Sequence, residues 1–115
     1  MRKFDESKEM IFIFLLLLSR IYHPETIDSM QKSIHTHVQV SGIVTLVKKE
    51  ADGDIHFRIS DTHNHFIVCE IIPSIPLTPP KLKQMVTVSG IRRYDSETNH
   101  NWMEIHPVEK WELMK

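Results

Sequence analysis

Several features that often reveal a function are scarce in this sequence. It has one cysteine and three glycines, a formal net charge of −1, and no uninterrupted apolar run longer than nine residues. The single cysteine, Cys69, excludes an intramolecular disulfide, and its place inside the apolar string "FIVCEII" predicts a buried thiol. A net charge near zero gives no overall positive field, so any contact with nucleic acid must depend on a local group of residues.

Common catalytic signatures are missing as well. The chain has no glycine-rich phosphate loop, no Ser-His-Asp arrangement and no paired CxxC motif. What remains is an ordinary globular composition, with 41% apolar and 25% charged residues in a chain of 115. This length and composition predict one domain with a self-sufficient hydrophobic core.

The first part of the chain, residues 1–34, differs from the rest. Residues 10–18, "MIFIFLLLL", are too few to span a bilayer, which takes about 20 apolar residues, but they suit the hydrophobic region of a signal peptide. The balanced charges of "MRKFDESKE" and the lack of a small-residue cleavage pattern argue against export. Residues 1–34 are therefore either an apolar helix docked on the domain or a partner, or a signal or anchor-like extension. The corresponding locations are the cytoplasm for a docked helix, and export or a membrane anchor for the extension, with membrane contact only through residues 10–18 if they are retained.

The string "PETIDSMQKSI" predicts a short amphipathic helix or a linker. Pro24 suits the first turn of a helix, and Ile27, Met30 and Ile34 would then lie on one face. The main domain is predicted to follow, over residues 35–115.

Residues 35–115 show the two-residue period of β-strands. Five strands are predicted, within "HVQVSGIVTLVKKE", "DIHFRIS", "HFIVCEII", "QMVTVSGIRRY" and "NWMEIHPVEKWEL". The third is apolar on both faces, which indicates a central strand. The segment "PSIPLTPPKLK" carries four of the six prolines, so we predict a crossing loop there.

Two of the glycines, Gly42 and Gly90, lie inside predicted strands in the similar strings "VQVSGIV" and "VTVSGIR". Glycine inside a strand indicates a bend or bulge, which lets a small sheet curl and close. The predicted fold class is therefore all-β, a five-stranded OB-like Greek-key barrel with an N-terminal helical or apolar extension. Another small barrel, or a half-sandwich with an added helix, is the alternative.

The strings "DGDIH" and "WMEIHPVE" also resemble motifs of a group of small microbial OB-fold proteins, some of which carry export signals. The resemblance covers roughly residues 36–112. It implies an OB fold and the binding of nucleic acid.

In OB folds the ligand surface lies on strands two and three and on the loops that join strands one to two and four to five. The leading hypothesis is a binding module for single-stranded nucleic acid, with basic side chains for phosphates and aromatic rings for base stacking. The candidate residues are Lys48, Lys49, His56, Arg58, Arg92, Arg93, Tyr94 and Trp102. These two loops are "KKEADGD" and "YDSETNHN" in this chain. Both are acidic, through Asp52, Asp54, Asp95 and Glu97, and would repel phosphates unless a cation is bound among them.

That acidity supports a second hypothesis, a site for a divalent metal ion. Carboxylate and imidazole ligands suit borderline divalent ions, and the D-x-H and E-x-H spacings place each pair on one strand face. The candidate ligands are Asp52, Asp54, His56, Glu104 and His106. An ordinary hairpin turn at Asp52 and Gly53 explains part of the same pattern.

"DGDIH" also resembles the DGDT strand of staphylococcal-nuclease-like OB enzymes, which implies a metal-dependent phosphodiesterase. The arginine-bearing segment of that family has no counterpart here. An exported protein-interaction module, with another protein as partner, is a further alternative. Both binding hypotheses require the two acidic loops to border one pocket.

Overall fold

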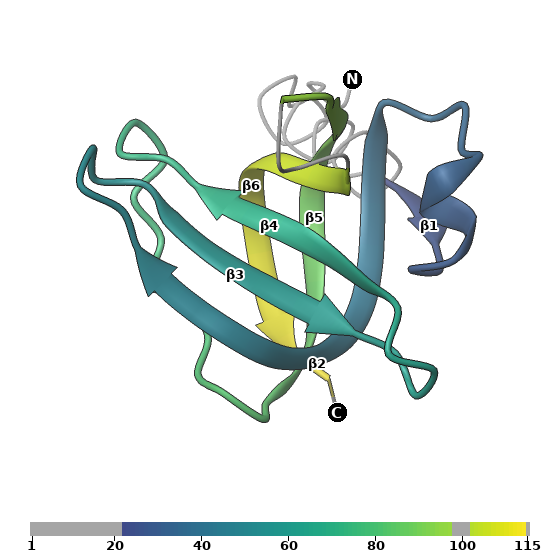
Figure 1. The fold of residues 1–115 in the computed structure, drawn as a ribbon, viewed down its shortest axis with the longest axis horizontal. Helices are drawn as coiled ribbons and strands as arrows, with labels where there is room; N and C mark the ends of the chain where they lie inside the picture. Colours follow the sequence, from purple (N-terminus) through teal and green to yellow (C-terminus); the bar gives the residue numbers. More distant parts are fainter. Residues whose placement is uncertain (1–21, 98–101, 115) are drawn as a thin grey trace, which may run out of the picture.

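The structure is a computed structural model that describes residues 22–97 and 102–114. Within these residues the chain forms six strands (Figure 1), which are β1 His23–Glu25, β2 His37–Lys49, β3 Ile55–Ser60, β4 Phe66–Ile71, β5 Met85–Asp95 and β6 Trp102–Leu113. The five predicted strands are confirmed as β2 to β6. The short strand β1 was not predicted.

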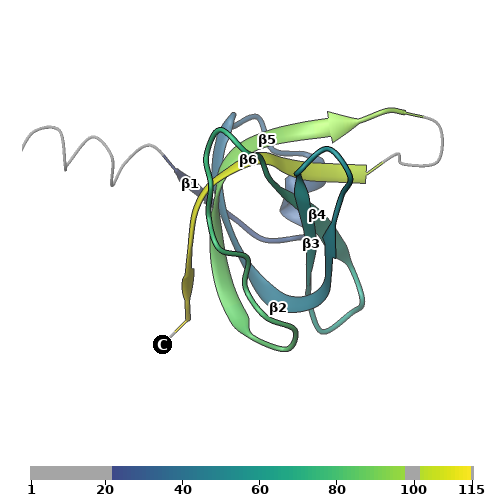
Figure 2. The ribbon, with the colours of Figure 1, turned by 90° about the vertical axis from the view of Figure 1, so that its left-hand side faces the viewer.

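Strands β2 to β6 close into a barrel. The sheet order is β2-β3-β4-β6-β5, and a further pairing of β2 with β5 closes it. All of these pairs are antiparallel except β4 with β6, which run parallel. This connectivity confirms the predicted OB-like barrel. Figure 2 shows how β2 curls around the barrel, and how the ends of β5 and β6 project beyond it.

The long strand β2 closes the barrel because it is shared between two neighbours. Its first half, His37–Ile43, pairs with β5, and its second half, Ile43–Lys49, pairs with β3. The register shifts between Val44 and Leu46. A β-bulge of this kind bends a strand and increases its twist, so the chain can pass from one side of the barrel to the other.

Gly90 allows β5 and β6 to approach closely. A β-carbon at this position would overlap the carbonyl oxygen of Pro107 and lie 2.6 Å from Cγ2 of Ile105. The register of β5 on β6 also shifts on both sides of Gly90. The predicted bend at this glycine is therefore confirmed, and its cause is the space that β6 occupies.

The core follows the alternation read from the sequence. Every second residue of β2 from Val38 to Val44 points inward, as do Phe57 and Ile59 of β3, and Val38, Val40, Phe57 and Ile59 are fully buried. All of β4 from Ile67 to Ile71 is buried, as expected for a central strand. Cys69 lies in this run and its thiol is buried, which confirms that prediction.

The described part of the N-terminal segment, residues 22–34, packs on the barrel without forming an α-helix. β1 pairs in parallel with β2, and a single 3-10 turn covers Ser29–Gln31. Ile27 and Met30 are buried in the core, whereas Ile34 is 91% exposed. The predicted amphipathic helix is wrong here, because the strand pairing of His23–Glu25 takes the place of a first helical turn.

The residues on which the predicted signal or anchor depends, 10–18, lie outside the described part of the chain. Within residues 22–97 and 102–114, no helix is both long enough and apolar enough to cross a membrane.

Candidate functional site

A pocket of about 780 Å³ lies on the face of the barrel that carries the polar side chains of β3, β4 and β6. The turn between β2 and β3 borders it through Asp52, and the segment after β5 borders it through Glu97. The expectation that both acidic loops border one pocket is therefore confirmed. In OB folds this strand face and these two loops form the usual ligand surface.

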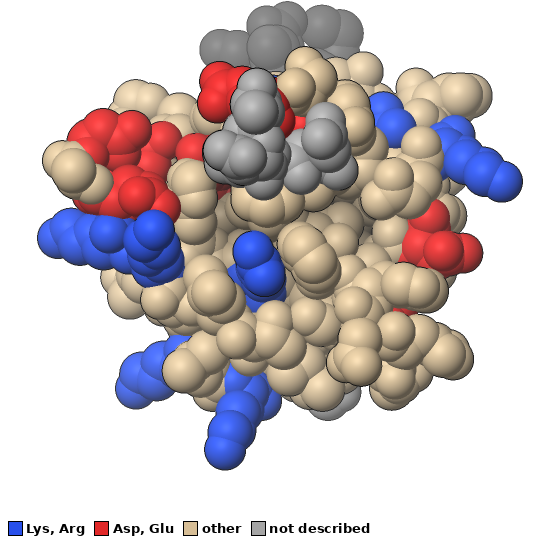
Figure 3. Space-filling model, viewed as in Figure 1, with Lys and Arg blue, Asp and Glu red and all other residues tan. Residues whose placement is uncertain are grey.

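The pocket is acidic. Six carboxylate residues line it, against three lysines and arginines. In Figure 3 acidic side chains gather over the end of the β2–β3 hairpin, with basic side chains directly beside them. A bare polyanion would meet more repulsion than attraction inside such a pocket.

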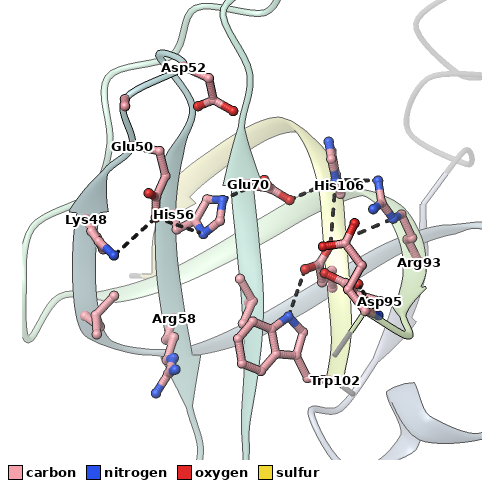
Figure 4. Close-up of a pocket in the computed structure, with 15 residues that line it drawn as sticks. Lys48, Glu50, Asp52, His56, Arg58, Glu70, Arg93, Asp95, Trp102 and His106 are labelled. Carbon is pink, nitrogen blue, oxygen red and sulfur yellow. Dashed lines mark hydrogen bonds and ion pairs between the residues drawn. The ribbon is translucent and has the colours of Figure 1, made fainter. Parts of the chain in front are cut away.

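Glu70, on β4, lies at the centre of the pocket between two histidines (Figure 4). His56, its cross-strand neighbour on β3, approaches Oε1 of Glu70 with Nε2 at 2.6 Å. From the other side, Nδ1 of His106 lies 2.8 Å from Oε2 of Glu70. Glu70 is 8% exposed. Glu70 therefore links the Asp54–His56 pair at the start of β3 to the Glu104–His106 pair of β6.

His56 has a carboxylate at each ring nitrogen. Its Nδ1 lies 3.5 Å from Oε1 of Glu50, on the side away from Glu70. The ring is thus held in one orientation, with Nε2 directed at Glu70. Lys48 in turn lies 3.6 Å from Glu50. These contacts fix Glu70 from the β3 side of the pocket.

Nδ1 of His106 lies close to one hydrogen-bond acceptor and one hydrogen-bond donor. Nδ1 lies 2.8 Å from Oε2 of Glu70 and also 2.8 Å from a guanidinium nitrogen of Arg93. A protonated Nδ1 can donate to Glu70 but then faces an N–H of Arg93. A deprotonated Nδ1 can accept from Arg93 but then faces a carboxylate oxygen. One of these two short contacts is therefore unfavourable in either state.

Glu104 is the most buried carboxylate of the pocket, at 2% exposure. Its Oε1 accepts a hydrogen bond of 2.8 Å from the indole N–H of Trp102. For Oε2 no hydrogen-bond partner is found among the described residues. Nδ1 of His106 lies 3.7 Å from Oε2, and Nε of Arg93 lies 4.0 Å from it. Burial, followed by the nearby charges of Glu70 and Asp95, raises the pKa of Glu104, while the Trp102 bond and Arg93 oppose that rise.

Asp54 extends the acidic group toward the β2–β3 turn. Its pKa is raised by desolvation and, after that, by the charges of Asp52 and Glu70. Asp52 itself performs turn chemistry, because its Oδ1 accepts the backbone N–H of Asp54 at 3.0 Å. The next residue, Gly53, has a φ of 95°, a left-handed conformation that favours glycine. The hairpin-turn interpretation of "DGD" thus accounts for Asp52 and Gly53 but not for Asp54.

A second feature of the pocket is a group of aromatic rings with an arginine. The guanidinium carbon of Arg58 lies 4.4 Å from the ring centroid of Phe66 and 5.6 Å from that of Trp102. The two rings meet edge to face, with centroids 6.3 Å apart. Arg58 and Trp102 both line the pocket. Cation and ring faces of this kind can stack on a planar ligand.

The predicted nucleic-acid residues divide between two parts of the molecule. Lys48, His56, Arg58, Arg93 and Trp102 line the pocket. Lys49, Arg92 and Tyr94 are not among its lining residues.

Arg92 has another contact, because its Nε donates to the backbone carbonyl oxygen of Met30 at 2.8 Å. It holds the 3-10 turn on the barrel. This contact accounts for Arg92 without any ligand.

Among the described residues, three groups have ligand atoms close enough together to hold a metal ion. Two of them share Glu70, one with Asp54 and His56 and the other with Glu104 and His106. Four of the five predicted metal ligands thus belong to these two groups. The fifth, Asp52, lines the pocket without joining either group.

The third group lies away from the pocket and consists of His23, Glu25 and His35. The imidazole rings of His23 and His35 stack with centroids 3.5 Å apart. Both carboxylate oxygens of Glu25 already accept hydrogen bonds, from Ser29 and from Ser33. This group is therefore less suited to a metal ion than the two that share Glu70.

Sequence reasoning missed Glu70. The residue lies in the apolar string "FIVCEII", and a single carboxylate in a predicted central strand gave no pattern to follow. The available signal was that a carboxylate in a buried strand needs a partner. That partner, His56, lies fourteen residues earlier in the chain.

No model of a protein family and no curated protein sequence matches the chain. Solved structures that match include a protein from Leishmania major Friedlin assigned as an aspartyl-tRNA synthetase, with 11% sequence identity and a TM-score of 0.61. The match covers 80% of this chain and 20% of that protein. At this identity the similarity establishes a shared fold alone.

Proposed function

We propose that this protein is an OB-fold binding module whose pocket holds a divalent metal ion on Glu70, Glu104 and His106. The observation that carries the proposal is Oε2 of Glu104, which lines the pocket on a residue only 2% exposed and accepts no hydrogen bond from the described residues. A buried carboxylate oxygen without a hydrogen bond carries a desolvation penalty of about 1–3 kcal/mol or more. A cation bound at this oxygen would remove that penalty.

The arrangement of His106 supports the same ion. A metal ion at Nδ1 would accept the ring's lone pair and, at the same time, bind Oε2 of Glu70. Nδ1 of His106 and Oε2 of Glu70 would then both donate lone pairs to one cation, and their short contact would no longer need a proton between them. The ligand atoms of the three residues lie within 4.8 Å of one another. Two ligands of one Zn²⁺ at about 2.0–2.2 Å are at most about 4.4 Å apart, so only a small closing movement is needed.

The surroundings resemble those of metal sites in general. His56 donates to Oε1 of Glu70 and leaves Oε2 for an ion, which is how outer residues orient ligating carboxylates. Two carboxylates with one imidazole suit Mn²⁺, Zn²⁺ or Co²⁺ better than Ca²⁺, which takes oxygen ligands only. Three protein ligands leave coordination positions that face the pocket.

Single-stranded nucleic acid is a second candidate ligand. The group formed by Arg58, Phe66 and Trp102 favours it, because a guanidinium beside two aromatic rings at the edge of an OB ligand face is suited to base stacking. Similarity of the fold to part of a tRNA synthetase chain is consistent with this ligand class. The acidic centre of the pocket weighs against a strand that binds without a cation.

The metal proposal is tested by thermal unfolding of the protein in EDTA and in increasing Mn²⁺ or Zn²⁺. We expect the melting temperature to rise with metal concentration, because a ligand at 100 times its Kd stabilises the native state by about 2.7 kcal/mol. Glu70→Gln should abolish the rise. Glu97→Gln, which neutralises an exposed carboxylate at the edge of the same pocket, should retain it. Equal responses of the two variants would refute the site.

The nucleic-acid candidate is tested by fluorescence anisotropy with a labelled oligonucleotide. Binding through phosphates must weaken as salt rises. We expect Trp102→Ala to weaken binding by about 1–3 kcal/mol through the loss of one stacking surface. No binding to single strands at low salt, with or without metal, would remove this candidate.

A further inference from the structure

Arg93 occupies the position that a metal ion on His106 would need. Its guanidinium nitrogen lies 2.8 Å from Nδ1 of His106, and its Nε lies 4.0 Å from Oε2 of Glu104. In this arrangement the guanidinium of Arg93 faces the Glu70–Glu104–His106 group. A metal ion and this guanidinium cannot both contact Nδ1.

We infer that metal binding displaces Arg93 from His106, and that the displaced guanidinium and the ion together bind the phosphate group of a nucleotide. This inference rests on the proposed metal site. It makes phosphate binding conditional on the metal, because the group that would hold the phosphate is otherwise directed at His106.

Displacement of Arg93 requires little rearrangement of the fold. The side chain of Arg93 is 47% exposed, whereas those of Glu104 and His106 are 2% and 21% exposed. It extends from β5 beside Glu104 of β6, its cross-strand neighbour. The arginine can therefore swing toward solvent while the ligands stay in place. A freed guanidinium binds phosphate oxygens through two parallel N–H donors.

The charge of the pocket supports metal binding before phosphate binding. Six carboxylates against three basic residues repel a phosphate as long as no metal is bound. A divalent ion offsets two of those carboxylates and places positive charge beside Glu104, the most buried of them. Both the attraction by the ion and the release of Arg93 then act on the same phosphate.

The remainder of the pocket is suited to the base. Its volume of about 780 Å³ falls within the range of about 300–1,000 Å³ that is usual for small-molecule sites. Trp102 lies between the metal-ligand group and Arg58. Its indole N–H donates to Glu104, and its ring lies beside the guanidinium of Arg58. A phosphate near the metal ligands thus places the attached nucleoside beside the indole and the guanidinium of Arg58.

The test is isothermal titration calorimetry of the full chain with adenosine monophosphate, first in EDTA and then in saturating Mn²⁺, corrected for binding of the nucleotide to free Mn²⁺. Adenosine, which lacks the phosphate, is titrated in parallel. The variant is Arg93→Gln, and the matched control is Lys49→Gln, an exposed cation that does not line the pocket. Mn²⁺ is also titrated alone into each protein.

We expect the wild type to bind the nucleotide at least about tenfold more tightly in Mn²⁺ than in EDTA, whereas adenosine should show no such dependence. Arg93→Gln should bind Mn²⁺ at least as tightly as the wild type, since a competitor is removed. It should lose about tenfold or more in affinity for the nucleotide, as expected for a charge-assisted hydrogen bond. Lys49→Gln should match the wild type in both titrations.

Two outcomes would overturn the inference while leaving the metal site intact. One is nucleotide affinity that is equal in Mn²⁺ and in EDTA. The other is an Arg93→Gln variant that binds the nucleotide as well as the wild type does. Failure of the wild type to bind Mn²⁺ in the titration without nucleotide would instead refute the proposed metal site, and the inference with it.

Discussion

Replacing Glu104 with glutamine should stabilise the metal-free protein and abolish its response to divalent metal ions. The carboxylate is 2% exposed, and no hydrogen-bond partner for its Oε2 is found among the described residues. Glutamine removes the buried charge and keeps an oxygen that can accept the N–H of Trp102. Removal of a buried negative charge that lies near Glu70 and Asp95 is worth about 1–3 kcal/mol in the free energy of unfolding. For a domain of about 100 residues, each kcal/mol corresponds to about 4–8 °C in melting temperature.

In saturating Mn²⁺ the difference in free energy of unfolding between Glu104→Gln and the wild type should become smaller or change sign. The wild type gains about 2.7 kcal/mol at 100 times its Kd, and Glu104→Gln gains nothing. Urea and thermal unfolding of both proteins, each in EDTA and in Mn²⁺, measure the four stabilities. A variant that is less stable than the wild type in EDTA, yet shows the same increase in Mn²⁺, would refute the reasoning on both counts.

The pH dependence of stability is a second way to test the prediction for Glu104. The folded state raises the pKa of Glu104 above its ordinary value of 4.5, so between that value and the raised one the folded state holds more protons than the unfolded state. The stability contribution of Glu104 in EDTA must therefore fall as the pH rises through this window. Glu104→Gln should lack this decrease, which unfolding in EDTA at a series of pH values would detect.

Three further predictions concern other parts of the molecule. His56→Gln should weaken Mn²⁺ binding by about 10- to 100-fold, because Glu70 loses the donor that orients it, and an unchanged affinity would show that His56 has no part in the site. Gly90→Ala should lower the free energy of unfolding in urea by about 1–3 kcal/mol, because the new methyl group overlaps the carbonyl oxygen of Pro107, and a neutral effect would contradict the close approach. Burial raises the pKa of Cys69 well above its usual range, so the thiol should react with a disulfide reagent only after unfolding, and prompt reaction of the native protein would refute its burial.

The barrel could be predicted because its strands carry local signals. The inward positions Phe57 and Ile59 alternate with outward polar ones, and the glycines mark where strands bend or approach. The strand β1 gave no such signal, because it has only three residues and takes its place by pairing with β2. A pairing with a distant segment cannot be read from the short string that makes it.

The site was predictable in part, for a related reason. Alternation along β3 and β6 placed His56, Glu104 and His106 on polar faces, and the structure brings these faces together. The same alternation could have separated Arg92 from Arg93, since neighbours in a strand point to opposite sides. Glu70 could not be recognised, because its meaning depends on the closure of β4 against both β3 and β6.

Anomalous scattering from crystals grown with Mn²⁺ or Zn²⁺ tests the central claim most directly. We predict one strong anomalous peak within about 2.3 Å of Oε2 of Glu104, Nδ1 of His106 and a carboxylate oxygen of Glu70, with the guanidinium of Arg93 turned away from His106. A pocket without an anomalous peak, in which Arg93 still contacts His106 at saturating metal, would contradict it.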